Sequence, residues 1–205
     1  MTKPLTRSLV ESAFLASATA TIFLINTYFP LGPLIRMLYP IPTALIYLRW
    51  GASSAWKTMF VAFLLLSVLM GPLRSIQFLI PFGLMGVMLG HLWQRQVTWF
   101  WSIGLGTLVS TLGSIFQLAL LSVMVGENLW VYSTVQITGI LSWLWQLFGS
   151  LDQPELWLVQ ILAIAAVIFS NLVYQLLVHL AAQFLLERIG NPIPQSPAWL
   201  QNLIS

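Results

Sequence analysis

The side chains that could perform acid–base or metal chemistry are few in this sequence and lie far apart. The 205 residues include two histidines, His91 and His179, together with five acidic residues and no cysteine. Without cysteine, the chain offers no disulfide and no thiolate for catalysis or metal binding. No phosphate-binding loop, zinc-protease motif or serine-hydrolase motif occurs, and an enzyme site needs titratable groups that converge. We therefore expect no enzyme, no catalytic residue, no metal site and no cofactor.

A few polar residues could instead bind a ligand. Arg36 and Arg74 lie in two proline-containing links between apolar segments. Their guanidinium groups could attract an anionic group of a substrate, or they could rest against lipid phosphate. Gln77 is close to Arg74 in sequence, and Asn171 falls near the middle of a long apolar segment, where a polar side chain needs a partner. The candidate substrate-binding residues are therefore Arg36, Arg74, Gln77 and Asn171.

The last apolar segment carries a polar residue at every fourth position. The series is Asn171, Gln175, His179, Gln183 and Glu187. Residues four apart lie on one face of a helix. This stripe predicts hydrogen bonds to a neighbouring helix near its middle and solvation at its end. The alternative is a pocket or a contact with a partner protein.

Small residues recur every four positions in the first apolar segment, at Ser12, Ala16 and Ala20. Small side chains at this spacing let another helix backbone approach closely. One interpretation is a docking face for a second membrane protein. The other is packing against a helix of the same chain, and the sequence leaves both open.

The composition indicates that lipid surrounds most of the chain. Only 6% of the residues are charged and 59% are hydrophobic, with a mean hydropathy of +0.89. A soluble domain normally carries about 25% charged residues. The net charge of +3 is spread over single cations, which excludes a basic patch for nucleic acid. The expected partner is membrane lipid.

Apolar segments long enough to cross a bilayer recur along the chain. A spanning helix needs about 20 mostly apolar residues. We predict an all-α integral membrane protein with six spans, at about residues 12–29, 34–50, 54–70, 76–93, 97–125 and 154–188. Pro40 and Pro42 predict that the second span is kinked or begins late. The predicted organisation is a cytoplasmic N-terminus (1–11), a membrane domain (12–188) and a tail (189–205) that lies at the membrane surface.

The segment Asn128–Gly149 is harder to assign. Thr134, Thr138, Ser142 and Gln146 recur every four residues, opposite an apolar face that includes tryptophan. Such a helix can lie in the membrane interface. We expect an interfacial or re-entrant helix here, and the alternative is a seventh span.

The positions of the charges predict an orientation. With six spans and both termini in the cytoplasm, six of the eight cations lie inside, and Arg36 and Arg74 lie outside. A seventh span would reduce the ratio to five against three. Because Lys and Arg favour the cytoplasmic side, we expect a multi-pass protein of the cell (inner) membrane with a cytoplasmic N-terminus. We expect no buried acidic residue inside any span, which argues against a proton-coupled pump acting alone.

Taken together, these features resemble a known group of membrane proteins. A basic N-terminus precedes the Ala16-x-x-x-Ala20 step, a proline-rich link and glycine-punctuated hairpins. The stretch PFGLMGVMLGHL from Pro81 to Leu92 resembles the glycine-rich fourth span of the substrate-binding S components of energy-coupling factor (ECF) transporters. Over about residues 8–188 the arrangement looks closest to the YybS-like predicted membrane proteins, which have S-component character.

The resemblance implies a six-helix subunit that captures a vitamin or other micronutrient from outside the cell. It also implies that Ala16 and Ala20 dock on a transmembrane coupling subunit that works with ATPase subunits. No vitamin-specific motif is matched, so no substrate residue carries over. The alternative function is a non-transporting accessory or assembly factor, or a small subunit of a larger membrane complex.

Overall fold

The structure is a computed structural model that describes residues 5–29, 32–147 and 155–197. Throughout these ranges the chain forms helices and connecting turns, without a strand, which confirms the predicted all-α class. Parts of five predictions lie outside the described residues. These are the N-terminal segment at residues 1–4, the break at residues 30–31, the end of the segment Asn128–Gly149 at residues 148–149, the start of the last span at residue 154, and the tail beyond residue 197.

Five helices in the described part of the chain are long and apolar enough to cross a membrane. They are α1 (Leu5–Tyr28), α4 (Ala52–Met70), a broken helix over Pro72–Gln94, α7 (Trp99–Val125) and α9 (Leu156–Arg188). They match five of the six expected spans. The glycines Gly51, Gly71 and Gly126 end helices with positive φ angles, which glycine adopts at little cost.

The second expected span is shorter than the sequence predicted. It consists of the single turn α2 (Pro33–Arg36) and the ten-residue helix α3 (Ile41–Trp50), whose residues 41–47 are all buried. Pro42 lies at the start of α3, where its missing N–H breaks no helical hydrogen bond. The prolines therefore delay the helix, as expected, and a ten-residue helix is too short to span a bilayer alone.

Helix α3 nevertheless returns the chain along α1. At one end, the amide nitrogen of Asn26 donates to the hydroxyl of Tyr39 at 2.7 Å. At the other end, the indole nitrogen of Trp50 donates to the carboxylate of Glu11 at 2.7 Å. Because Asn26 and Glu11 lie near opposite ends of α1, the two helices run antiparallel. Because α3 is buried, protein rather than lipid surrounds the helix ends, where backbone groups lack a helical partner.

The helix over Pro72–Gln94 contains a break at Pro81. Helix α5 (Pro72–Gln77) leads through the π-helical turn η1 (Phe78–Gly83) into α6 (Leu84–Gln94), and Ile80 has non-helical backbone angles. Proline removes a helical hydrogen bond and leaves carbonyls without their usual donors. The side chain of Gln117 on α7 donates to the carbonyls of Gln77 (2.9 Å) and Ile80 (3.1 Å). A polar group from a neighbouring helix thus compensates for the break.

Close approach of α3 and α6 depends on two glycines. A Cβ at Gly86 would lie 2.8 Å from the carbonyl oxygen of Pro40, and one at Gly90 would lie 2.3 Å from the Cβ of Tyr47. Ala44 of α3 packs in the same cluster of buried residues as Leu89 and Trp93 of α6. The sequence pattern of small residues therefore serves packing within the chain here.

The described part of the tail packs onto the protein. Ile193 is buried in the same cluster as Trp93 and Trp99, and the indole nitrogen of Trp99 donates to the carbonyl of Pro194 at 2.7 Å. Ser196 is also buried. Residues 189–197 therefore pack against the helices, and the prediction that the tail lies at the membrane surface stays a prediction.

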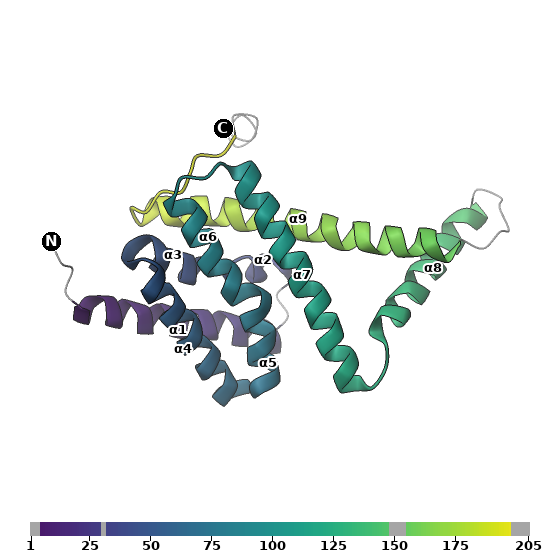
Figure 1. Ribbon diagram of the computed structural model, residues 1–205, viewed down its shortest axis with the longest axis horizontal. Coiled ribbons are helices and arrows are strands. Elements are labelled where there is room, and N and C mark those ends of the chain that lie inside the picture. The colour runs from purple at the N-terminus through teal and green to yellow at the C-terminus, as the bar shows by residue number, and fades with distance from the viewer. Residues whose placement is uncertain (1–4, 30–31, 148–154, 198–205) are drawn as a thin grey trace.

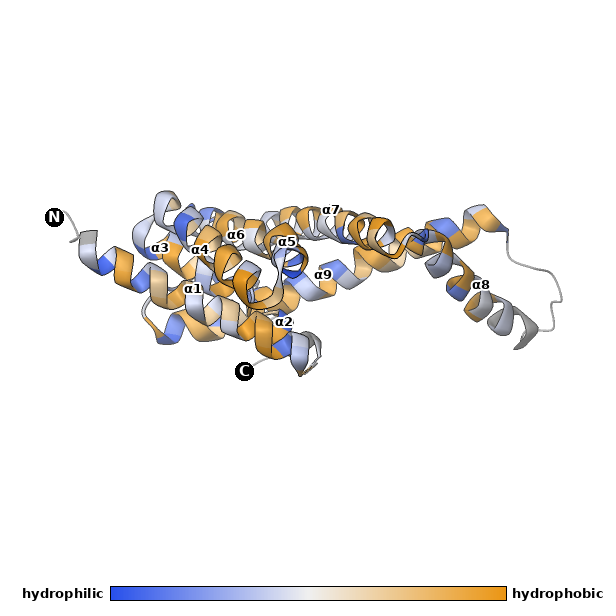
Figure 2. Cartoon of the chain, turned by 90° about the horizontal axis from the view of Figure 1, so that it is seen from below, coloured by the Kyte–Doolittle hydropathy of each residue, from blue (hydrophilic) through white to orange (hydrophobic). Residues whose placement is uncertain are grey.

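Two regions are visible in the arrangement of the helices. Helices α1 to α6 form the N-terminal bundle, in which α1 packs along α4 and α3 packs along α6. Helices α7, α8 (Leu129–Leu147) and α9 form the C-terminal triangle: α7 and α9 cross near the middle of the molecule, and α8 closes the third side (Figure 1). Hydrophobic residues lie along both regions, outward faces included (Figure 2).

Helix α8 covers the segment that the sequence left ambiguous. It is 19 residues long, but it is not among the helices that are apolar enough to count as candidate spans. Its polar face carries Thr134, Thr138 and Ser142, whose hydroxyls donate to carbonyls one turn earlier. These observations fit an interfacial or re-entrant helix, and its position relative to the bilayer stays a prediction.

Candidate functional site

A cleft of about 920 Å³ lies between the three helices of the C-terminal triangle. Its walls come from the second half of α7, the first half of α8 and the first half of α9. Representative lining residues are Leu118 and Ala119 of α7, Ile137 of α8 and Ile164 of α9. Small-molecule sites typically measure about 300–1,000 Å³ and are mostly apolar with a few polar groups. The cleft has this size and this chemistry.

The turn between α7 and α8 holds one corner of the cleft. Gly126 ends α7 in the left-handed conformation, and its N–H donates to the carbonyl of Ser122. The side chain of Asn128 accepts hydrogen bonds from the N–H groups of Trp130 (3.0 Å) and Val131 (3.4 Å) and so caps α8. The hydroxyl of Ser122 accepts a bond from the N–H of Leu129. Only three residues thus separate the end of α7 from the start of α8.

Polar side chains at the opposite corner join α7 to α9. The amide nitrogen of Asn171 lies 3.3 Å from the hydroxyl oxygens of both Thr111 and Ser114. Thr111 and Ser114 line the cleft, whereas Asn171 lies behind them. Asn171 thus contacts two hydroxyls that face the cleft, and its assignment to a binding site stays a prediction.

The polar stripe of α9 continues away from the cleft into the protein. The amide nitrogen of Gln175 donates to the hydroxyl of Ser110 at 2.7 Å and fills the space beside Gly106. The Nε2 atom of His179 lies 2.8 Å from the hydroxyl of Ser102. Gln175 and His179 are fully buried. The expectation of interhelical hydrogen bonds along this stripe is confirmed for Asn171, Gln175 and His179.

The other predicted ligand-binding residues do not converge. Arg74 and Gln77 are neighbours on α5, with the guanidinium nitrogen 3.5 Å from the amide oxygen. Arg36 is exposed at the end of α2, and its carbonyl accepts a hydrogen bond from Tyr174 at 3.0 Å. Within the described residues, no hydrogen bond or ion pair joins either arginine to Asn171. These contacts therefore do not bring the four predicted residues together in one site.

A family model covers almost the whole chain. It is described as predicted membrane protein (DUF2232), and it matches residues 17–202. The chain belongs to this family. The match is consistent with the YybS-like resemblance and with a multi-pass membrane protein, and it carries no activity or substrate. The comparisons with curated proteins and with solved structures gave no match.

The proposed docking residues of this family member are buried within the bundle. Ser12, Ala16 and Ala20 are 8%, 0% and 3% exposed, and the two alanines share a buried cluster with Ala62 and Leu66 of α4. This is the close approach that small residues permit. Of the two alternatives left open above, packing within the chain is the one that these contacts fit. Docking of a partner on these residues stays a prediction without an exposed surface to support it.

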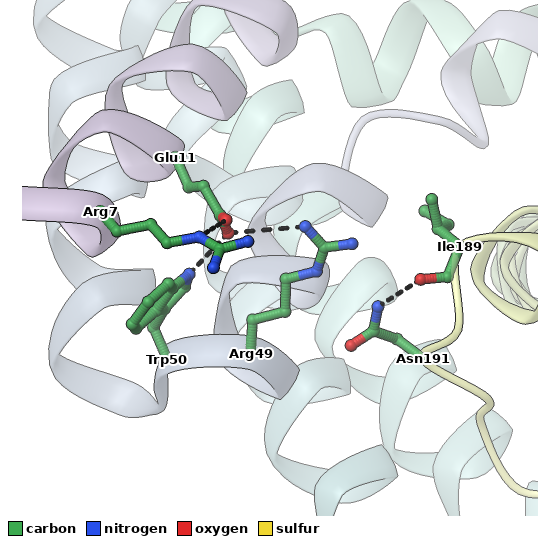
Figure 3. Close-up of polar contacts among 6 residues, drawn as sticks. All are labelled: Arg7, Glu11, Arg49, Trp50, Ile189 and Asn191. Carbon is green, nitrogen blue, oxygen red and sulfur yellow. Dashed lines mark hydrogen bonds and ion pairs between the residues drawn. The ribbon is translucent and has the colours of Figure 1, made fainter. Parts of the chain in front are cut away.

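A charged cluster ties α1 to the end of α3 (Figure 3). The carboxylate of Glu11 lies 3.4 Å from the guanidinium of Arg7 and 3.5 Å from that of Arg49, and it accepts the bond from Trp50. Helix α1 begins at Leu5, so Glu11 lies within the candidate span Thr6–Tyr28. Glu11 is only half-buried, so the expectation that no buried acidic residue falls inside a span is not contradicted here, and two cations and an indole compensate its charge.

The residues that line the cleft were missed from the sequence. Thr111 and Ser114 are short polar residues in a helix already rich in them, so nothing singled them out. Glu127 and Asn128 had a signal: a glycine and a capping residue directly follow a long apolar run, which marks a tight turn between two helices. That signal locates the turn, but the cleft behind it depends on where α9 crosses.

Proposed function

We propose that this protein is a membrane-embedded substrate-binding subunit, similar to an S component of an ECF-type uptake transporter, that holds a vitamin or other micronutrient in the cleft of the C-terminal triangle. The observation that carries the proposal is the cleft itself. It has the volume of a small-molecule site, and its apolar walls carry a few hydroxyls at one corner and a carboxylate at the other. A structural subunit needs no such space.

The hydrogen bonds from Asn171 to Thr111 and Ser114 support this proposal. Asn171 donates to two lining hydroxyls from behind, which orients Thr111 and Ser114 without filling the cleft. Binding sites commonly use such outer partners to fix the groups that face the ligand. In a helix pair that served packing alone, the same hydroxyls would be covered by neighbouring side chains.

A coupling subunit with its ATPases belongs to the same proposal and needs a different surface from the one expected. Because Ala16 and Ala20 are covered by α4, a partner would contact the exposed side of α1, which includes Phe14 and Ile25. These side chains are 71% and 40% exposed. Lipid is the other neighbour that this apolar face can accept.

The test is a cleft-filling substitution with a matched control. Ala119→Trp places an indole in the cleft from an exposed position on α7. Ala165→Trp makes the same change at an exposed position of α9 that is outside the lining. Both variants and the wild type are purified in lipid nanodiscs from cells, and retained small molecules and proteins are measured by mass spectrometry.

The expected result is a small molecule retained by the wild type and by Ala165→Trp and lost from Ala119→Trp. Equal retention in all three samples would mean that the ligand binds elsewhere. Recovery of the wild type in one large complex with no small molecule would contradict the proposal and favour the accessory-subunit alternative.

A further inference from the structure

We infer that the cleft selects ligands that combine an apolar body with a cationic group, such as a primary amine, and that the carboxylate of Glu127 provides this selectivity. The inference rests on the proposed function, because it names the class of substrate for the same site. Nothing in the sequence had singled out Glu127 as a binding residue. The charges and contacts around the cleft support a binding role for Glu127.

Glu127 is the only charged residue among the described residues that line the cleft. It lies in the α7–α8 turn, between the glycine that ends α7 and the asparagine that caps α8. Within the described residues, ion pairs join Glu11 to Arg7 and Arg49, and none involves Glu127. The carboxylate is exposed, so an incoming cation can reach it without displacing a protein partner.

No Lys or Arg belongs to the part of the chain that forms the cleft. All eight Lys and Arg residues belong to residues 3–95 or to position 188. The α7–α8–α9 segment from residue 99 to residue 187 contains only acidic charges, at positions 127, 152, 155 and 187. A region of one sign attracts ligands of the opposite sign and repels anions. The local charge therefore favours a cation over the anionic substrate that Arg36 and Arg74 had suggested.

The rest of the cleft suits the apolar part of such a ligand. Leu118, Ile137 and Ile164 contribute aliphatic surface from all three helices. The hydroxyls of Thr111 and Ser114 lie four helical turns of α7 before Glu127, about 20 Å away at 1.5 Å per residue. A ligand anchored at Glu127 thus has its apolar body along the cleft walls and can reach towards hydroxyls at the far corner.

The test uses a matched pair of fluorescent probes in nanodiscs of zwitterionic phosphatidylcholine. Dansylcadaverine carries an aromatic body and a primary amine, and its N-acetyl derivative has the same body without the charge. Energy transfer from tryptophan to the dansyl group reports binding, since Trp130 lines the cleft. Empty nanodiscs give the partition background. Each probe is titrated into wild type, Glu127→Gln, Glu155→Gln and Ala119→Trp.

We expect the wild type to bind the amine about fivefold more tightly than the acetylated probe, as an exposed ion pair allows. Glu127→Gln should remove this preference, whereas Glu155→Gln, which removes an exposed acid outside the lining, should keep it. The preference should also fall when salt is raised, because exposed charges are screened. Ala119→Trp should abolish saturable binding of both probes.

Two results would overturn the inference, and they differ in what they say of the proposed function. Equal binding of the two probes, unchanged by Glu127→Gln but lost in Ala119→Trp, would leave the cleft as a binding site and remove its selectivity for cations. Saturable binding of neither probe, with a phospholipid retained by the wild type, would identify the cleft as a lipid site and would contradict both proposals.

Discussion

The N-terminal bundle and the C-terminal triangle are built from similarly apolar helices but bury them to different extents. Half of the residues are buried in the most apolar 18-residue stretch of the Pro72–Gln94 helix, whereas only 11% are buried in the corresponding stretches of α7 and α9. The bundle brings backbones together through Ala16, Ala44, Gly86 and Gly90. The triangle meets closely at one crossing, where Gln175 packs against Gly106, and diverges beyond it.

The difference shows what small residues do in a membrane protein. Lipid is as apolar as leucine, so helices gain little by exchanging lipid for one another unless their backbones fit closely or exchange hydrogen bonds. In the bundle, small residues permit that fit over whole helices. In the triangle, polar residues join α7 to α9 at the crossing, and the diverging halves leave space for a ligand. Close packing thus dominates one half of the chain, and the cleft lies in the other half.

The largest effect is expected from a bulky residue at the closest contact of the bundle. A Cβ at Gly90 would lie 2.3 Å from the Cβ of Tyr47, whereas one at Gly104 of α7 would meet nothing within 4 Å. Gly90→Val should lower the free energy of unfolding by about 3 kcal/mol or more, as overpacking does. Gly104→Val is the matched control and should change it by less than about 1 kcal/mol. Unfolding by SDS titration in mixed micelles, followed by circular dichroism, measures both.

If Gly90→Val and Gly104→Val had equal effects, the close approach of α3 and α6 would not stabilise the bundle, and the comparison of the two regions would fail.

A smaller effect is expected at the charged end of the bundle. Glu11→Ala removes the acceptor of Trp50 and the acidic partner of Arg7 and Arg49. We expect the free energy of unfolding to fall by about 1–2 kcal/mol, because the two cations stay together without compensation. Glu187→Ala, at an exposed position of α9, is the control. The same SDS titration compares them, and a loss of equal size in the control would show that removing any acid has this effect.

The smallest effect is expected at the turn that holds the cleft open. Gly126 has a φ of +74°, so Gly126→Ala should cost about 1 kcal/mol in strain. Its consequence for the cleft should exceed its consequence for stability, because a shift of α8 changes the walls. We expect weaker binding of dansylcadaverine with little change in the SDS midpoint. A loss of stability without any change in probe binding would show that the turn does not shape the cleft.

The sequence determined the class of the fold and most of the helix limits. Mean hydropathy and the spacing of Gly and Pro predicted six spans, five of which are long helices, and a second span that is kinked or begins late, because those signals act within a few residues of the chain. The four-residue period of Asn171, Gln175 and His179 identified one face of α9 as special, and hydrogen bonds to α7 occupy that face.

Only the tertiary structure decided what covers each face. A stripe of small residues such as Ala16 and Ala20 has the same appearance whether a helix of the same chain or a partner packs on it, and here α4 does. Glu11 became part of a span because α1 starts at Leu5 and brings the carboxylate to Arg49 and Trp50. The cleft, likewise, follows from the angle at which α9 crosses α7. Periodicity reports which side of a helix differs from the others, whereas contacts between residues far apart in the sequence decide what that side meets.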